Sequence, residues 1–318
     1  MMSINNKLTK INLTNMANPA ITTGYAGESA GVYLSAALKQ AKSLEYLTTY
    51  ENIKFKRTLQ VMTHTESLIK AASCDFDEQG ILALADKVLT PVNMEINVQL
   101  CKKDVLADWQ AAQMRAGANN SDFSSDFTAF VMSYLAGHIG QHVENNIWTG
   151  NSATAGHFAG FLTATTGIFA VDGNTVGVSK TAAFSAANII ENLNLAVDNL
   201  PATSYMKDDL YLYVGVEAYR FYLAAISTLG YVNAYNMQGD YSPLFNGVKI
   251  AVCPGMPADT IVAAQQGNLF FGTDLISDQT EIRMLDMSDL DGSDNVRVVA
   301  KFTGSVQCGI GAEIVVVS

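Results

Sequence analysis

The chain has 318 residues, of which 49% are hydrophobic and only 15% are charged, and its formal net charge is −11. This length suits one large or two modest domains with a buried core. The charged fraction is well below the roughly 25% that is usual in soluble proteins, which favours apolar surface covered by partners. The acidic balance argues against a nonspecific nucleic-acid binder, because attraction to phosphate requires clustered Lys and Arg.

The charge is unevenly distributed, since residues 1–60 carry seven Lys or Arg and only three Glu. A basic N-terminal region on an acidic body fits an arm that contacts an acidic neighbour, or an inner surface near packaged DNA. The four cysteines form no C-x-x-C pair and have no His at metal-ligand spacing, so we expect free thiols in a reducing compartment. The N-terminus lacks the apolar core of a signal peptide, and no apolar run reaches the roughly 18 residues of a membrane span. We therefore expect a soluble chain made in the cytoplasm.

The first hundred residues predict an arm, a helix and two strands. Residues 1–24 are rich in Asn and Thr, and we expect an extended arm that becomes ordered only against a neighbour. Helical spacing of apolar residues follows over Ser29–Leu47. Asn52–Met62 and Val92–Leu100 each alternate apolar and polar residues with period two, which predicts two strands. We expect these strands to pair as a long antiparallel hairpin with residues 63–87 at its far end, and an insert of that length is typical of an interaction element.

A long helix is the main prediction for the middle of the chain. A short helix over Asp104–Ala116 comes first, and the capping residues Asn119–Ser121 then precede the long one. Apolar residues recur at three- and four-residue steps as far as Trp148, so the helix has a length of about 40 Å. The usual globular helix has only about 11–12 residues, so this helix is unusually long.

The second half predicts a compact α/β unit followed by returning strands. Its elements alternate between amphipathic helices and short β-branched runs, and a P-G-M-P turn joins the second and third strands. In chain order they are a helix over Ala182–Leu200, a strand over Leu210–Val214, a helix over Glu217–Thr228, and strands over Val248–Val252, Thr260–Ala263, Asn268–Gly272, Glu281–Met287, Asn295–Thr303 and Ala312–Val317. We expect the last strands to pair with the base of the hairpin and to pack on the long helix.

One motif matches a catalytic pattern. Gly27-Glu28-Ser29-Ala30-Gly31 fits the G-x-S-x-G nucleophile elbow of serine hydrolases. The elbow needs a buried strand before it and a histidine further along the chain, but no such strand precedes it and no histidine follows His157. A glycine-punctuated entry to the first helix explains the motif better.

Metal-binding patterns are equally weak. His138 and His142 stand four residues apart on the long helix, yet the zinc-protease pattern needs a Glu where Ile139 stands. Paired carboxylates such as Asp75/Asp77 and Asp289/Asp291 fit solvated turns, with a weak divalent-ion site between subunits as the alternative. The sequence thus predicts no catalytic residue, no cofactor and no metal site.

The stretch Asn246–Asp278 carries a family resemblance. Its Gly-x-Lys-Ile strand, Pro-Gly-Met-Pro turn, short Ile-Val-Ala strand and Asn-Leu-Phe-Phe-Gly-Thr-Asp-Leu segment resemble the A-domain exit of tailed-phage major capsid proteins with the HK97 fold. The segment Gly24–Lys39, reading G-Y-A-G-E-S-A-G-V-Y-L-S-A-A-L-K, is similar to that family as well. The order of the predicted elements extends the resemblance over nearly the whole chain.

The resemblance implies an α+β, HK97-like capsid fold with six segments. They are an N-terminal arm (1–24), an N-terminal helix region (25–50), an extended E-loop hairpin (51–101), a P-domain (102–180) with a spine helix at 121–148, an α/β axial A-domain (181–273) and returning P-domain strands (274–318). The segment 268–274 then forms the junction at which the chain crosses from the axial domain back to the peripheral sheet.

The implied function is structural rather than enzymatic. The resemblance implies a major capsid subunit that self-assembles into pentamers and hexamers of an icosahedral shell around phage DNA. It also implies assembly in the host bacterial cytoplasm, a location in the virion capsid, and no cofactor. The expected partners are other copies of the chain, a separate scaffolding protein, a portal, any decoration proteins, and double-stranded DNA held without sequence specificity, but no membrane. A separate scaffold is expected because the chain lacks the long helical N-terminal extension of members that fuse the two.

Ten residues are expected at contacts between copies, and they lie in the arm and in the hairpin. They are Met16, Pro19, Tyr25, Lys54, Lys56, Arg57, Lys70, Phe76, Asp77 and Lys87. Lys70 and Lys87 are placed in the hairpin tip, but nothing marks a partner Asn, so the Lys–Asn crosslink of one capsid family is not carried over. Two alternatives stay open, namely an encapsulin-type compartment shell with the same fold and, from a different class, a serine hydrolase using Gly27–Gly31.

Overall fold

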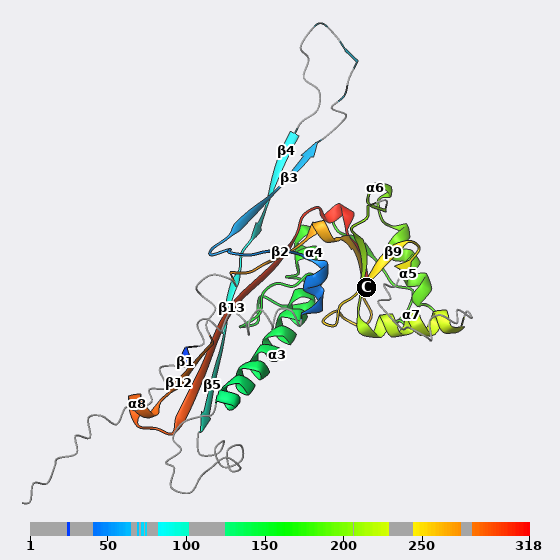
Figure 1. Cartoon of the computed structure of the whole chain (residues 1–318). Helices are drawn as coiled ribbons and strands as arrows, with labels where there is room; N and C mark the ends of the chain where they lie inside the picture. The colour runs from blue at the N-terminus through cyan, green and yellow to red at the C-terminus, as the bar shows by residue number, and fades with distance from the viewer. Residues whose placement is uncertain are drawn as a thin grey trace, which may run out of the picture.

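The computed structural model describes residues 24–25, 41–64, 69, 71–72, 74, 82–101, 125–205, 207–228, 244–274 and 282–318. These residues form two six-stranded sheets, a separate two-stranded hairpin, a long helix and several short helices (Figure 1). The elements are β1 (Gly24–Tyr25), η2 (Lys42–Tyr46), β2 (Thr48–Tyr50), β3 (Arg57–His64), β4 (Leu82–Leu89), β5 (Val92–Cys101), α3 (Ser125–Thr149), α4 (Ile168–Asp172), β6 (Val176–Val178), α5 (Ile189–Asp198), α6 (Ala202–Tyr205), β7 (Leu210–Val214), α7 (Val216–Thr228), β8 (Leu244–Phe245), β9 (Val248–Val252), β10 (Ile261–Gln265), η4 (Gln266–Asn268), β11 (Leu269–Gly272), β12 (Ile282–Asp286), α8 (Ser288–Asp291), β13 (Asn295–Cys308), η5 (Gly311–Glu313) and β14 (Val315–Val317).

The first sheet is organised around β13, a strand of 14 residues. Its order is β1-β12-β13-β11-β2, and β5 also pairs with β13. Alternate β13 side chains are buried in one cluster with the inward face of α3, which runs beside β13 and β5 in Figure 1. The buried β13 residues of this face are Val296, Val298, Ala300 and Phe302. The period of two in the strand therefore directs one face of the sheet onto the helix.

The helix α3 confirms the predicted long helix, with 25 residues from Ser125 to Thr149. Its buried residues recur at three- and four-residue steps and form one stripe, as expected of a helix covering a sheet. They are Met132, Leu135, Ala136, Ile139, Val143 and Ile147. Tyr134, which the sequence placed on this stripe, lies outside it and is 60% exposed. Among the helices that the structure describes, none is both long and apolar enough to cross a membrane.

The predicted pairing of Asn52–Met62 with Val92–Leu100 is wrong. β3 pairs with β4 in antiparallel register from Arg57↔Leu89 to His64↔Leu82, and β5 pairs instead with β13 from Cys101↔Asn295 to Val92↔Gly304. Alternation identified the faces of both strands correctly but carries no information on their partners. The sequence of β4, L-A-L-A-D-K-V-L, is rich in good helix formers and gave no strand signal. The hairpin is therefore formed by β3 and β4, and β5 belongs to the sheet.

The second sheet has the order β6-β14-β10-β7-β9-β8. Its side chains alternate between two cores, so that Leu212, Ile261 and Val315 pack in the cluster with α5 and α7, while Tyr213 and Val262 pack in the cluster with α3. The strands predicted at Leu210–Val214 and Val248–Val252 are confirmed as β7 and β9. This layer of helices on one face gives the expected α/β unit, seen beside the β13 sheet in Figure 1.

Two helix boundaries differ from the sequence prediction. The helix predicted from Ala182 begins only at Ile189, because Asn188 Oδ1 accepts hydrogen bonds from Ser185 N (2.8 Å) and Ser185 Oγ (3.0 Å) and closes a turn there. Of the helix predicted over Ser29–Leu47, the described part is the short 3₁₀ helix η2. The helix predicted over Asp104–Ala116 lies outside the described residues.

The chain crosses between the two sheets just before the expected junction segment 268–274. The expected return of the last strands is only partly right, because β13 lies in the first sheet whereas β14 pairs with β10 and β6 in the second. β10 belongs to the second sheet, and after η4 the chain enters β11 of the first sheet. There β11 pairs antiparallel with β13 and parallel with β2. The segment after the P-G-M-P turn thus leads from one layer to the other.

Candidate assembly surfaces

The hairpin β3–β4 stands away from the two sheets in Figure 1. Among the strands that the structure describes, these two pair only with each other, and Gln307 Nε2 of β13 donates a hydrogen bond to Val88 O near the base of the hairpin at 3.1 Å. An isolated two-stranded hairpin is marginally stable in water unless another surface packs against it. Its geometry alone therefore points to a covering partner.

One face of the hairpin is apolar and exposed. Leu82, Leu84 and Val88 share this face of β4, and Met62 lies directly opposite Leu84 on β3. Leu84 is 62% exposed and Met62 is 64% exposed. Leu82, Leu84 and Met62 adjoin one another in the outer part of this face, whereas Asp86 opposite Gln60 separates them from Val88. Large apolar side chains at this exposure mark an interaction site.

The opposite face of the hairpin is apolar as well. Leu59 and Val61 on β3 lie across from Lys87 and Ala85 on β4, and the Leu59 and Val61 side chains are only half-buried. A strand covered on one side normally alternates apolar with polar residues. Apolar residues on both faces indicate that partners cover the hairpin from two sides.

The base of the hairpin is fixed to the body of the same chain. Leu89 is fully buried, and a Cβ at Gly272 of β11 would lie 2.0 Å from Leu89 Cδ2, so any larger residue there would displace the Leu89 side chain. Lys87 Nζ forms an ion pair with Asp172 of α4 and lies 3.7 Å from Cys308 Sγ. Burial raises the pKa of the Cys308 thiol, and the nearby Lys87 ammonium partly offsets this. These contacts fix the direction in which the hairpin projects.

The structure corrects the position predicted for Lys87. It lies opposite Leu59, two residues from the paired end of the strands, and not at the hairpin tip. Its side chain is 19% exposed and is engaged by Asp172 of its own chain. The role of Lys87 in contacts between copies stays a prediction.

Three other predicted contact residues lie at the start of β3 and on the loop that leads into it. Lys54, Lys56 and Arg57 are all exposed. Arg57 stacks its guanidinium 3.9 Å from the centre of the Tyr50 ring, and Phe55 between the two lysines is 77% exposed. An exposed aromatic ring flanked by cations is typical of an interaction surface.

The remaining predicted contact residues are little described. Tyr25 lies in β1, where it pairs with Arg283 of β12 at the edge of the first sheet. Five others lie outside the described residues, namely Met16, Pro19, Lys70, Phe76 and Asp77. The hairpin base and the sheet edge are thus the parts of the predicted contact set that can be placed.

A buried carboxylate joins three parts of the chain behind these surfaces. Glu144 of α3 accepts hydrogen bonds from Ser43 N (3.0 Å), Ser43 Oγ (2.5 Å) and Gly255 N (3.1 Å). Trp148 Nε1 donates to Ser43 Oγ at 2.7 Å. The site links η2, α3 and the turn between β9 and β10. Burial raises the pKa of the adjacent Cys253 thiol, and the Glu144 carboxylate raises it further. Sequence reasoning missed this site, because nothing distinguishes Glu144 from a solvated helix residue.

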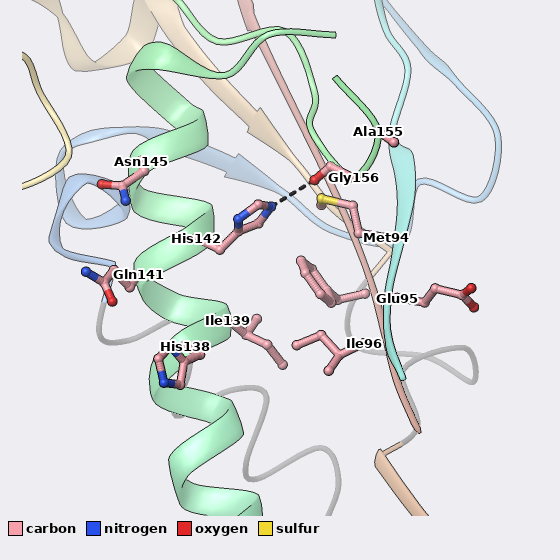
Figure 2. A pocket seen from close by; sticks show the side chains of 11 residues that line it. Met94, Glu95, Ile96, His138, Ile139, Gln141, His142, Asn145, Ala155 and Gly156 are labelled. Carbon is pink, nitrogen blue, oxygen red and sulfur yellow. Dashed lines mark hydrogen bonds between the residues drawn. The ribbon is translucent and has the colours of Figure 1, made fainter. Parts of the chain in front are cut away.

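The histidines that were considered as metal ligands have other partners. Figure 2 shows His142 pointing from α3 toward Gly156, whose carbonyl oxygen lies 2.8 Å from His142 Nε2. His138 packs edge-on against Tyr134 at 4.5 Å between ring centres. Both line a cavity of about 420 Å³ between α3 and the β5–β13 pair. Among the described residues there is no group of three His, Cys, Asp or Glu that could hold a metal ion.

The other chemical motifs give no site. The G-x-S-x-G motif at 27–31 lies outside the described residues. Asp291 accepts hydrogen bonds from Ser293 N (2.9 Å) and Ser293 Oγ (2.6 Å), which lower the pKa of its carboxyl group, as in a solvated turn. Cys253 and Cys308 are buried free thiols, Cys101 is half-buried and Cys74 is exposed.

Comparison with known proteins gives matches only among solved structures. No protein-family model matches the sequence, and no curated protein matches it. The capsid of an empty GTA particle matches with a TM-score of 0.59 and 12% identity, over 87% of this chain and 89% of the other. Gordonia phage Cozz gives 0.55 and 13% over 88% and 86%, and a virus-like particle from Pyrococcus furiosus gives 0.51 and 9% over 92% and 98%. Identities this low show the fold, and by that measure this chain has the HK97-like fold of phage capsid proteins.

Proposed function

We propose that this chain is the major capsid subunit of a tailed bacteriophage. Its copies assemble into pentamers and hexamers, and these close into an icosahedral shell that encloses double-stranded DNA without reading its sequence. The role is structural, and no catalytic residue is assigned. The fold shared with phage capsids supports this proposal across most of the chain.

The observation that carries the proposal is the hairpin β3–β4. It projects from the body with Met62, Leu82 and Leu84 more than half exposed, and no third described strand extends its sheet. A monomeric protein gains nothing from such an element, which invites aggregation. In a shell the same residues become buried against neighbouring copies, and the interface is spread over several small contacts.

The domains follow the segments expected from the sequence, except that β6 and β14 belong to the second sheet and β11 to the first. In this proposal the second sheet with α5 and α7 forms the axial domain near the capsomer axes. The first sheet with α3 forms the peripheral domain, and the hairpin and the N-terminal arm lap onto neighbours. Contacts around a capsomer are heterologous, because each copy presents one surface to the next and a different one to the previous. A permanent assembly of this kind buries more than about 2,000 Å² per subunit.

Further partners complete the proposal. A separate scaffolding protein directs shell assembly, a portal occupies one vertex, and decoration proteins bind where the phage has them. Assembly takes place in the host bacterial cytoplasm, and the chain then resides in the virion capsid.

Size and content of the particles test the proposal. The chain is expressed in bacteria, and the product is separated by gel filtration and inspected by negative-stain microscopy. Closed shells formed by the expressed chain support the capsid function, as does nuclease-resistant DNA inside the particles isolated from phage-infected cells. A monomer at micromolar concentration under all conditions, with or without the scaffold, contradicts it.

The alternative is an encapsulin-type compartment. The likeness to a virus-like particle from Pyrococcus furiosus favours it, although at a lower TM-score than the likeness to the GTA capsid. The content of the native particles separates the two functions. A protein cargo without DNA assigns the chain to a compartment shell.

A further inference from the structure

A buried carboxylate at the end of β11 has no assigned role. Asp274 is only 2% exposed. Its backbone N–H donates to Thr303 Oγ1 at 2.8 Å, and Thr273 Oγ1 donates to Thr303 O at 3.1 Å. Two bonds to β13 therefore fix the backbone from which this carboxylate projects.

One oxygen of this carboxylate is left without a partner. Asp274 Oδ1 is buried and accepts no hydrogen bond from any described residue. Asp274 also takes part in none of the ion pairs found among the described residues. A buried carboxylate without a partner is costly, so such groups are normally paired with a cation or with hydrogen-bond donors. A missing partner is therefore expected.

Asp274 lines a cavity that can receive this partner. The cavity has a volume of about 360 Å³ and lies at the β5–β13 pair. Its other lining residues combine polar atoms with an apolar wall, and they are Asn93, Met94, Glu95, Lys301, Phe302 and Thr303. Asn93, Glu95 and Lys301 are exposed, whereas Met94, Phe302 and Asp274 are buried, so the cavity has a polar, solvent-exposed rim and an apolar wall. Lys301 of the same chain is thus a cation at this cavity, but none of the ion pairs found among the described residues joins it to Asp274.

The chemistry of this lining fits an organic cation better than a metal ion. Calcium and magnesium need six or more oxygen ligands in a defined geometry, and the described residues offer no cluster of three His, Cys, Asp or Glu. An ammonium or guanidinium needs one carboxylate for its charge and neutral acceptors for its other protons. The aliphatic stem of Lys or Arg can lie against Met94 and Phe302.

We propose that the Asp274 cavity binds a Lys or Arg side chain of a second copy of this chain. This inference rests on the proposed function and names a contact within it. The best donors are the exposed cations Lys54, Lys56 and Arg57, because none of them forms an ion pair with a described residue. They lie at the base of the projecting hairpin, where a neighbouring copy is expected to overlap.

The same chain also approaches this site, which defines the main competing explanation. Ile53 N donates to Thr273 O at 3.3 Å, so the loop that carries Lys54 passes close to Asp274 of its own chain. A pair within one chain is already present in the unassembled subunit. A pair between copies forms only in particles, and this difference gives the test.

The first experiment compares D274N with wild type in two fractions of the full-length chain, unassembled subunits and particles, separated by gel filtration. Thermal unfolding of the unassembled D274N subunit is expected at or above the wild-type temperature, because an unpaired buried charge is removed. D274N particles are expected to dissociate in urea at a lower concentration than wild-type particles. D198N, which removes an exposed carboxylate from α5, is the matched control and changes neither quantity.

The second experiment reverses charges across the contact. D274R is expected to lower the yield of particles at least tenfold, and combining it with one of K54E, K56E or R57E is expected to recover most of the yield. Normal assembly of both D274N and D274R overturns this inference but leaves the proposed function standing. Equal destabilisation of subunit and particle by D274N also overturns it, by placing the partner in the same chain. If wild-type particles are lost in EDTA but not in buffer, the cavity holds a metal ion and the inference is overturned. If the wild-type chain forms no particles at all, the inference and the proposed function are overturned together.

Discussion

Glu144 shows how one residue can hold several layers of this fold in place. Its carboxylate satisfies two backbone N–H groups and one hydroxyl from segments more than 100 residues away in the sequence. A Cβ at Gly255 would lie 2.3 Å from Glu144 O, so the P-G-M-P turn packs directly against α3. The long helix is therefore tied to both the η2 segment and the second sheet.

Replacing Glu144 tests this role. E144A leaves the N–H groups of Ser43 and Gly255 buried without an acceptor, and each such group costs about 1–3 kcal/mol. We expect the unfolding free energy of the unassembled subunit to fall by about 3 kcal/mol in urea titrations. E191Q, at an exposed position of α5, is the control and is expected to change it by less than about 0.5 kcal/mol. An E144A subunit as stable as wild type contradicts the role.

His157 predicts a pH dependence of subunit stability. Burial and the neighbouring His142, with ring centres 4.9 Å apart, lower its pKa, so the fold favours the neutral ring. Asn146 Oδ1 lies 2.5 Å from His157 Nδ1 and accepts a hydrogen bond from the Nδ1–H group of the neutral ring. A group with a lowered pKa contributes its stability in full above the unfolded value of about 6.5, and loses it as the pH falls through the folded value.

The expected result is a loss of subunit stability between pH 7 and pH 5 that is smaller in H157Q than in wild type. H138Q, at an exposed histidine of the same region, should keep the wild-type slope. Melting temperatures measured across this pH range check the prediction. An identical slope in wild type and H157Q would show that His157 does not contribute.

At the scale of elements, the hairpin β3–β4 is anchored at its base and uncovered along its length. The Lys87–Asp172 ion pair and the buried Leu89 hold the base, whereas Met62 and Leu84 are exposed further out. Substitutions in the outer part should therefore separate assembly from folding.

Leu84 gives the sharpest version of this test. L84D places a carboxylate in a patch that we expect to be buried between copies, where an unpaired charge is costly. The unassembled subunit should keep its unfolding free energy within about 0.5 kcal/mol, because the site is exposed there. The particle yield by gel filtration should fall at least about tenfold, while L84M, which keeps the apolar volume, should assemble. Normal yields from L84D would exclude this face from the interface.

The same elements show what sequence can and cannot predict here. The long helix α3 and the strands β7, β9 and β11 follow from local periodicity and turn residues, and they were predicted within a few residues. The partner of β5 was mispredicted, because two alternating strands carry the same pattern and only the three-dimensional packing decides which strand pairs with which. Strand β4 was missed because its Ala and Leu residues favour helix locally. The Glu144 and Asp274 sites join residues distant in sequence, and no local pattern marks them.

At the scale of the whole molecule, the chain combines two packed sheets with a projecting hairpin (Figure 1). Its low charge fraction of 15% agrees with a subunit that covers much of its surface with neighbours. The two-faced hairpin, the exposed Phe55 loop and the Asp274 cavity are separate places at which copies can meet. A shell built in this way is stabilised by many modest contacts instead of one large one.

The central claim is that copies of this chain form a closed shell through the hairpin. Negative-stain microscopy of the purified wild-type chain and of L84D, with the scaffold added if the chain alone does not assemble, tests it most directly. The account predicts uniform closed particles for wild type and only unassembled subunits for L84D. A wild-type protein that remains monomeric, or an L84D protein that forms the same particles, contradicts it.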